Sequence, residues 1–179
     1  MPKWSTISVV DNIVVIGIDP ASTKVAFVGM SLENNNQFVV KRHKKLGKSG
    51  GEACSNGRKV TLDFVNQLKD GFGPSKIFAF IESPIVGRGG VRTTMVQCFT
   101  SGAIQGALHE QRIPTQAVNV SSWKKQVVGY GRASKEDVAE HLRLRWNDIF
   151  TKAEGDQDIY DAACIALFGC KQLNDNTVV

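Results

Sequence analysis

The chain has 179 residues, of which 42% are hydrophobic and 22% are charged, and 22 Lys and Arg against 17 Asp and Glu give a formal net charge of +5. These values are typical of a globular domain and exclude disordered, collagen-like and coiled-coil classes. Asp11 and Asn12 interrupt the apolar start of the chain, and no run approaches the roughly 18 apolar residues of a membrane span. We therefore expect neither a secretory signal nor a membrane helix.

The cysteines and the basic residues are distributed very differently. The four cysteines are scattered and include no CxxC pair, which argues against a zinc site or a disulfide framework and predicts an intracellular, cytoplasmic protein. Five cations within eight residues account for the whole positive surplus: Lys41, Arg42, Lys44, Lys45 and Lys48. No repeat or linker divides the chain, so one domain is expected over residues 1–179, with a core at about 13–173 and short flexible termini.

The first half of the chain is predicted to begin with three strands. Residues 13–18 are almost wholly apolar, which is typical of a strand covered on both faces. Residues 24–30 and 37–42 are predicted to form a hairpin through the polar turn at 33–36. Apolar residues recur at helical spacing over 59–69 and predict the first helix.

The second half alternates strands with helices. Strands are predicted at 77–81 and 115–120, and a helix at 94–111 lies between them. Ser134 and Asp137 form a capping-box pattern at the start of another helix, and the last helix is expected over 156–173. This order predicts an α/β domain.

Four acidic residues stand out on this scaffold. Asp19 and Glu82 each follow an apolar strand directly, and such positions converge on a ligand-binding crevice when the strands are neighbours. Asp158 and Asp161 are three residues apart, so they share one helix face, which continues as the apolar Ile165. These two acids therefore begin a stripe that points inward.

Four carboxylates in a partly desolvated crevice repel one another, so they must take up protons or bind cations. A pair of Mg²⁺ ions, held by oxygen ligands alone, suits phosphodiester hydrolysis. Some acids also have a plainer interpretation: Asp19 precedes a proline in a turn, Glu82 could be solvated surface, and Asp156 and Asp158 can cap a helix.

The motifs resemble those of the RuvC family of Holliday-junction resolvases. The likeness covers residues 16–20, 81–82, 124–135 and 158–163, in that order, within roughly 13–167. It implies an RNase H-like fold with a mixed five-stranded sheet, its first three strands antiparallel, flanked by helices. It also implies a homodimer that resolves four-way DNA junctions by paired symmetric nicking in recombination and repair.

The resemblance implies the site residues as well. Asp19, Glu82, Asp158 and Asp161 match the family's acidic tetrad and would be the catalytic residues and the ligands of two Mg²⁺ ions, which Mn²⁺ can replace. Asp156 falls outside the matched spacing and is interpreted as a helix-start residue. Ala21, where the family usually has Gly, and the Gly/Arg loop at 87–92 depart from the cellular members and resemble phage-encoded ones.

Several basic residues are expected to bind DNA, because Lys and Arg contacts with phosphates release counterions. They are Lys124, Lys125, Arg132 and Lys135 around the 129–131 turn, Arg88 and Arg92 in the Gly/Arg loop, and Lys44 and Lys45 in the basic run. Lys125 and Lys135 are expected to approach the cleaved strand. The histidines, Trp123 and Trp146 are interpreted as packing or surface residues.

Three alternatives remain at this stage. A related RNase H-like nuclease could act on RNA or RNA/DNA hybrids, and a non-catalytic protein could bind branched DNA. A phosphotransfer protein of the actin-like ATPase fold would need Gly-rich phosphate loops and a second domain. The four intact acids favour a nuclease.

Overall fold

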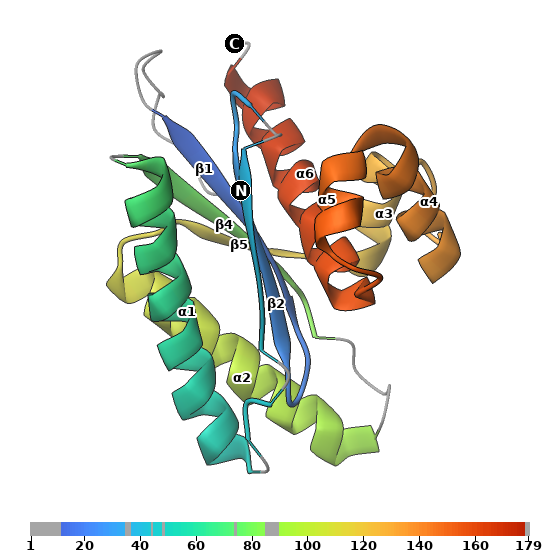
Figure 1. Ribbon diagram of the computed structural model, residues 1–179. Helices are drawn as coiled ribbons and strands as arrows, with labels where there is room; N and C mark the ends of the chain where they lie inside the picture. Colours follow the sequence, from blue (N-terminus) through green and yellow to red (C-terminus); the bar gives the residue numbers. More distant parts are fainter. Residues whose placement is uncertain are drawn as a thin grey trace.

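The computed structural model describes residues 12–34, 37–43, 45–47, 49–73, 75–84 and 90–177. A central sheet is covered by α1 and α2 on one face and by α6, with α3 to α5 beside it, on the other (Figure 1). The helices are α1 (Gly50–Phe72), α2 (Gly90–Glu110), α3 (Val120–Val127), α4 (Lys135–Arg145), α5 (Asn147–Lys152) and α6 (Gln157–Thr177). None of the helices described is long and apolar enough to cross a membrane.

The sheet has five strands in the order β3-β2-β1-β4-β5. They are β1 (Ile13–Pro20), β2 (Val25–Ser31), β3 (Phe38–His43), β4 (Lys76–Glu82) and β5 (Thr115–Val118). The first three strands pair antiparallel, whereas β1 with β4 and β4 with β5 pair parallel. The predicted mixed five-stranded sheet, with its first three strands antiparallel, is confirmed.

Two hydrophobic cores lie on opposite faces of the sheet because successive strand residues alternate between faces. In β1, Val14, Ile16 and Ile18 belong to the core under α1, and Val15 belongs to the core under α6. All four are fully buried. This arrangement explains the nearly uninterrupted apolar run of β1.

Gly17 sets the distance between β1 and α6. A Cβ atom built at Gly17 would lie 2.0 Å from the carbonyl oxygen of Ala162 and 2.3 Å from the backbone nitrogen of Ala166. Any side chain at this position would therefore push α6 away from the sheet. The glycine places the first turns of α6 directly over the end of β1.

The structure differs from the sequence predictions at several element boundaries. The first helix begins at Gly50 rather than at residue 59, because Ser49 and Glu52 form a capping box. The strand predicted at 115–120 ends at Val118, because the side chain of Asn119 accepts a hydrogen bond from the backbone N–H of Ser121 and starts α3. Helices α3 and α5 were not predicted. The Ser134/Asp137 capping box is confirmed.

Candidate metal-dependent nuclease site

Asp19 and Glu82 lie side by side at the ends of neighbouring parallel strands. The register pairs Ile18 of β1 with Ile81 of β4, so the two acids are the next residues along their strands. Both occupy the positions of the pleat that face α6, as Val15 and Phe80 of the same strands do. The prediction that their strands are adjacent is confirmed.

Asp158 and Asp161 lie in the first turns of α6, above this edge of the sheet. The close approach at Gly17 keeps the helix near β1. Asp161 is the residue before Ala162, and Asp158 lies about one helical turn earlier. Asp19, Asp158 and Asp161 are all only partly exposed. Three elements distant in sequence thus bring the predicted acids to one place.

The other three acids act electrostatically on Asp19. The pKa of Asp19 lies well above its ordinary value, chiefly because its carboxyl group is desolvated. The negative charges of Glu82, Asp161 and Asp158 raise this pKa further, in that order. Lys24 acts in the opposite direction. In the absence of a bound cation, the fold therefore penalises ionisation of Asp19.

Asp161 experiences a more balanced environment. Burial raises its pKa, and the charge of Asp158 adds to this effect. Gln157 opposes it by donating a hydrogen bond of 2.9 Å from Nε2 to Oδ1 of Asp161. The cations of Lys124 and Lys135 lower the pKa as well, so both lysines lie within electrostatic reach of the acidic site.

Glu82 has a hydrogen-bond donor that sequence analysis did not identify. Nε1 of Trp123 donates to Oε2 of Glu82 at 2.9 Å. Trp123 is fully buried in the core between α3 and α6. The tryptophan therefore packs as predicted, and it also holds one oxygen of the Glu82 carboxylate in place.

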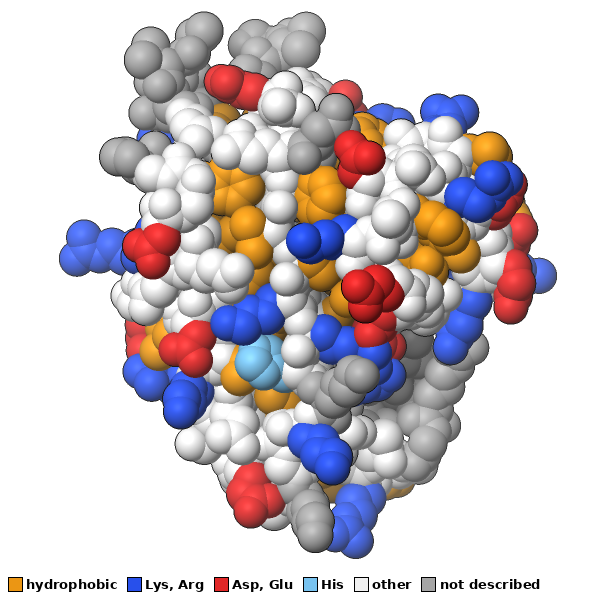
Figure 2. Space-filling view, in the orientation of Figure 1, with side chains coloured by type: hydrophobic (Ala, Val, Ile, Leu, Met, Phe, Trp, Pro, Cys, Tyr) orange, Lys and Arg blue, Asp and Glu red, His pale blue; other side chains and the backbone are white. Residues whose placement is uncertain are grey.

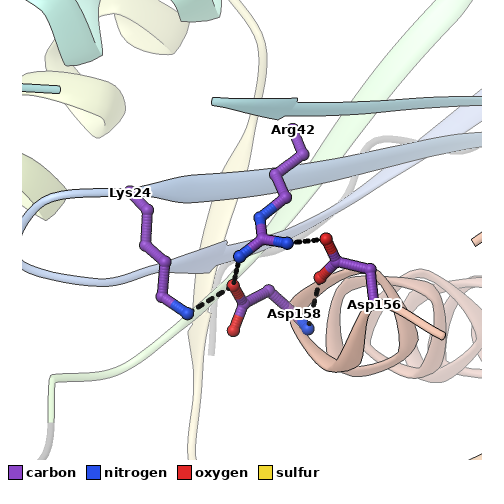
Figure 3. A network of polar contacts seen from close by, with 4 residues as sticks. All are labelled: Lys24, Arg42, Asp156 and Asp158. Atoms are coloured by element: carbon purple, nitrogen blue, oxygen red, sulfur yellow. Dashed lines mark hydrogen bonds and ion pairs between the residues drawn. The ribbon is translucent and has the colours of Figure 1, made fainter. Parts of the chain in front are cut away.

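Asp158 is held by two cations from the antiparallel part of the sheet (Figure 3). Its Oδ2 lies 2.5 Å from Nζ of Lys24 and 2.9 Å from Nη2 of Arg42. Nη1 of Arg42 pairs with Oδ2 of Asp156. Oδ1 of Asp156 accepts a hydrogen bond of 3.1 Å from the backbone N–H of Asp158, which confirms the interpretation of Asp156 as a helix-start residue.

The donor set of the site consists of carboxylate oxygens, which suits a hard cation such as Mg²⁺. As they stand, however, no three Asp, Glu, His or Cys side chains among the described residues form a group that could hold a metal ion. Trp123 and Gln157 each hold one oxygen of an acid, and Lys24 and Arg42 together hold Oδ2 of Asp158. The chemistry of the site fits a metal, provided that Lys24 and Arg42 release this oxygen.

The basic residues predicted to bind DNA fall into three groups. Nζ of Lys124 donates a hydrogen bond of 2.6 Å to the carbonyl oxygen of Ala133, so this lysine is partly engaged by the protein. The side chains of the second group are exposed: Lys125, Arg132, Lys135, Arg92 and Lys45. Lys44 and Arg88 lie outside the described residues. Figure 2 shows Lys and Arg side chains from the centre of one face to its lower tip.

In the sequence, Arg42 belongs to the basic run at 41–48, and no motif links Arg42, Lys24 or Trp123 to the acids. Arg42 carries a partial signal, because its neighbour Val40 shares the strand face that packs toward α6. The contact of Trp123 with Glu82 depends on how α3 packs, and nothing in the local sequence indicates it.

Known proteins resemble the chain in sequence. No family model matches it. The crossover junction endodeoxyribonuclease RuvC of Ehrlichia ruminantium is 24% identical over 157 residues, which cover 86% of this chain and 93% of that protein. The RuvC of Chromobacterium violaceum is 28% identical over 153 residues, which cover 86% and 83% of the two chains.

Solved structures have the same fold. Thermus thermophilus RuvC superposes with a TM-score of 0.70 at 22% identity, over 92% of this chain and 97% of that one. The same protein in complex with a Holliday junction substrate gives a TM-score of 0.73, over 92% and 96%. The yeast mitochondrial Holliday junction resolvase gives 0.55 at 14% identity, over 91% and 81%. The sequence and structural matches together confirm the predicted resemblance to the RuvC resolvases.

Proposed function

We propose that this protein is a metal-dependent endonuclease that resolves four-way DNA junctions by paired symmetric nicks. The observation that carries the proposal is the placement of Asp19 and Glu82 on neighbouring parallel strands, beneath Asp158 and Asp161 of α6. The RuvC homologues, which are named crossover junction endodeoxyribonucleases, support the substrate class. A protein that only bound DNA would gain nothing from four carboxylates, because they repel the phosphates.

The four acids would hold Mg²⁺, as two ions per site, and Mn²⁺ would substitute. Bound cations of this kind supply an activated water and stabilise the leaving oxygen in phosphodiester hydrolysis. The chain itself provides the orientation: Trp123 fixes the carboxylate of Glu82, and Gln157 fixes that of Asp161. The raised pKa of Asp19 supports a cation site here, because a bound cation would offset the repulsion that the other acids exert on it.

The DNA-binding surface in this proposal surrounds the acids. Lys124 and Lys135 act on Asp161 electrostatically, so they lie where a scissile phosphate would approach. The backbone N–H of Leu46 donates to the carbonyl oxygen of Thr23 at 2.7 Å, which brings Lys45 beside the β1–β2 turn at the same end of the sheet. Arg92, in the first turn of α2, and the exposed Lys125 and Arg132 extend this surface, and Lys44 and Arg88 remain predicted members of it.

The proposed active form is a homodimer that uses α2 as its interface. Three large apolar side chains on this helix are exposed at four-residue spacing: Val91 (78%), Met95 (51%) and Phe99 (52%). Side chains four apart lie on one helix face, so these three form an apolar stripe. A second copy of the chain would cover this stripe and would place two acidic sites on one junction.

We also infer a cytoplasmic location, in a bacterium or in a phage-infected host cell, where junction DNA is available. All four cysteines are free thiols. This agrees with a reducing compartment.

Cleavage of a synthetic four-way junction tests the proposal. Wild-type protein and Asp19→Asn are compared in Mg²⁺ and in EDTA, with linear duplex and RNA/DNA hybrid as control substrates. We expect symmetric paired nicks in the junction only, and their loss in EDTA and in Asp19→Asn, which should still bind the junction. Cleavage of the hybrid alone would overturn the substrate, and binding without cleavage would make the protein an architectural junction binder.

A further inference from the structure

Arg42 reaches the acidic site from the edge of the sheet. The register pairs Asp19 with Ala26 and Ala26 with Arg42, so the three residues form a row across β1, β2 and β3 on the face toward α6. Two strand spacings, about 10 Å, separate the ends of this row. The residue between them is an alanine, whose small side chain leaves room for a long side chain to extend over the sheet toward α6.

The guanidinium of Arg42 and the ammonium of Lys24 meet at one carboxylate oxygen. Both cations contact Oδ2 of Asp158, at 2.9 Å and 2.5 Å, while the second nitrogen of the guanidinium pairs with Asp156 (Figure 3). The charge that a divalent cation would supply to Asp158 is thus supplied by two side chains. Asp156 anchors the arginine without using any member of the tetrad.

Within the described part of the chain, one donor of Arg42 is left without a partner in this arrangement. Nε of Arg42 is buried and has no hydrogen-bond partner among the described residues. An unpaired buried donor costs stability. The side chain of Lys24 is 38% exposed, so its ion pair with Asp158 can open to solvent at little cost. These features suit contacts that exchange rather than contacts that only hold the fold together.

We propose that Arg42 and Lys24 are positioning residues for Asp158, which act as its internal counter-cations. In the protein without metal they hold the carboxylate of Asp158 and reduce repulsion among the acids, and they release Oδ2 when a divalent cation binds. They therefore set the metal concentration at which the site fills. This inference rests on the metal site of the proposed function and adds a competition within it.

The test is thermal unfolding of the full chain during titration with MgCl₂, without DNA. Wild type is compared with Arg42→Gln, Arg42→Lys and Lys24→Gln. Lys41→Gln is the matched control, since Lys41 pairs with Phe27 on the opposite face of the sheet and its loss makes the same change in net charge. The metal site of Arg42→Gln should fill at about two- to fivefold lower Mg²⁺ concentration, the range expected when one partly exposed ion pair stops competing.

The other variants separate charge from geometry. Arg42→Lys should keep a midpoint near that of wild type, because it retains the competing charge, and Lys41→Gln should also leave the midpoint unchanged. Lys24→Gln should also lower the Mg²⁺ concentration at the midpoint. This variant provides the test if Arg42→Gln does not fold. If wild type is stabilised by Mg²⁺ but the folded Gln variants fill at the same or a higher Mg²⁺ concentration, the role of Arg42 and Lys24 is overturned and the metal site is not. A wild type that does not respond to Mg²⁺ would overturn the metal site and the inference with it.

Discussion

Nε1 of Trp123 donates a hydrogen bond of 2.9 Å to Oε2 of Glu82, and this bond links the core between α3 and α6 to the acidic site. The indole is fully buried, so its packing fixes the position of the donor. Loss of a side chain that orients a metal-binding group typically costs about 10- to 100-fold in metal affinity or activity. Trp123 therefore couples the stability of the fold to the geometry of the site.

Replacement of Trp123 by Phe should lower junction cleavage about 10- to 100-fold, because the carboxylate of Glu82 loses an orienting donor. The variant should also lose about 1–3 kcal/mol of unfolding free energy. Trp146→Phe is the control, since Trp146 is half-buried beside the C-terminal half of α6, away from the acids. Cleavage rates and urea unfolding measure both effects. Equal cleavage by the two variants would show that Trp123 only packs.

Gly17 offers a test of how closely α6 must approach the sheet. In Gly17→Ala the new Cβ would meet Ala162 and Ala166, so the helix must shift. We expect the free energy of unfolding to fall by about 1–3 kcal/mol. Cleavage should fall about 100-fold, because a displacement of about 1 Å at a catalytic site has this effect. Gly71→Ala in α1 meets no atom within 4 Å and should be neutral or stabilising.

The sequence predicted the parts of the fold that local patterns determine. The strands at 13–18 and 77–81 were identifiable because both of their faces are buried, and the capping box at Ser134 marked the start of α4. The start of α1 was obscured by Gly50 and Gly51. Helices α3 and α5, with 8 and 6 residues, are too short to show a clear period.

The site likewise combines features that local sequence patterns indicate with features that only tertiary packing determines. Each acid on the sheet ends an apolar run, and the two on α6 follow helical spacing, so all four could be proposed from sequence. Their partners could not, because the contact of Arg42 with Asp158 depends on strand register and that of Trp123 with Glu82 depends on the packing of α3. Tertiary packing decides such contacts, and local sequence does not encode them.

The apolar stripe on α2 predicts the oligomeric state. Phe99→Asp places a charge within the proposed interface, at a side chain that is 52% exposed, so the fold should tolerate it while the dimer dissociates. Sedimentation equilibrium should give a dimer for wild type and a monomer for the variant. Leu144→Asp, at an exposed leucine on α4, should remain dimeric. A dimeric Phe99→Asp would place the interface elsewhere.

The raised pKa of Asp19 predicts how stability depends on pH. A carboxyl group whose pKa is higher in the folded than in the unfolded state binds more protons when folded, so its contribution to stability is lost as pH rises through the folded value. Asp19→Asn removes this penalty and should raise the melting temperature at pH 7 without metal, by about 2–4 °C for each kcal/mol. The gain should shrink as the pH falls to the ordinary value of 3.8 and below it, where Asp19 becomes protonated in the unfolded state as well. Saturating Mg²⁺ should reduce the gain at pH 7, because the cation stabilises the wild type and not the variant.

Asp70→Asn, an exposed change on α1, controls for the loss of one charge. A variant no more stable than wild type at pH 7 would show that Asp19 ionises without penalty in the fold.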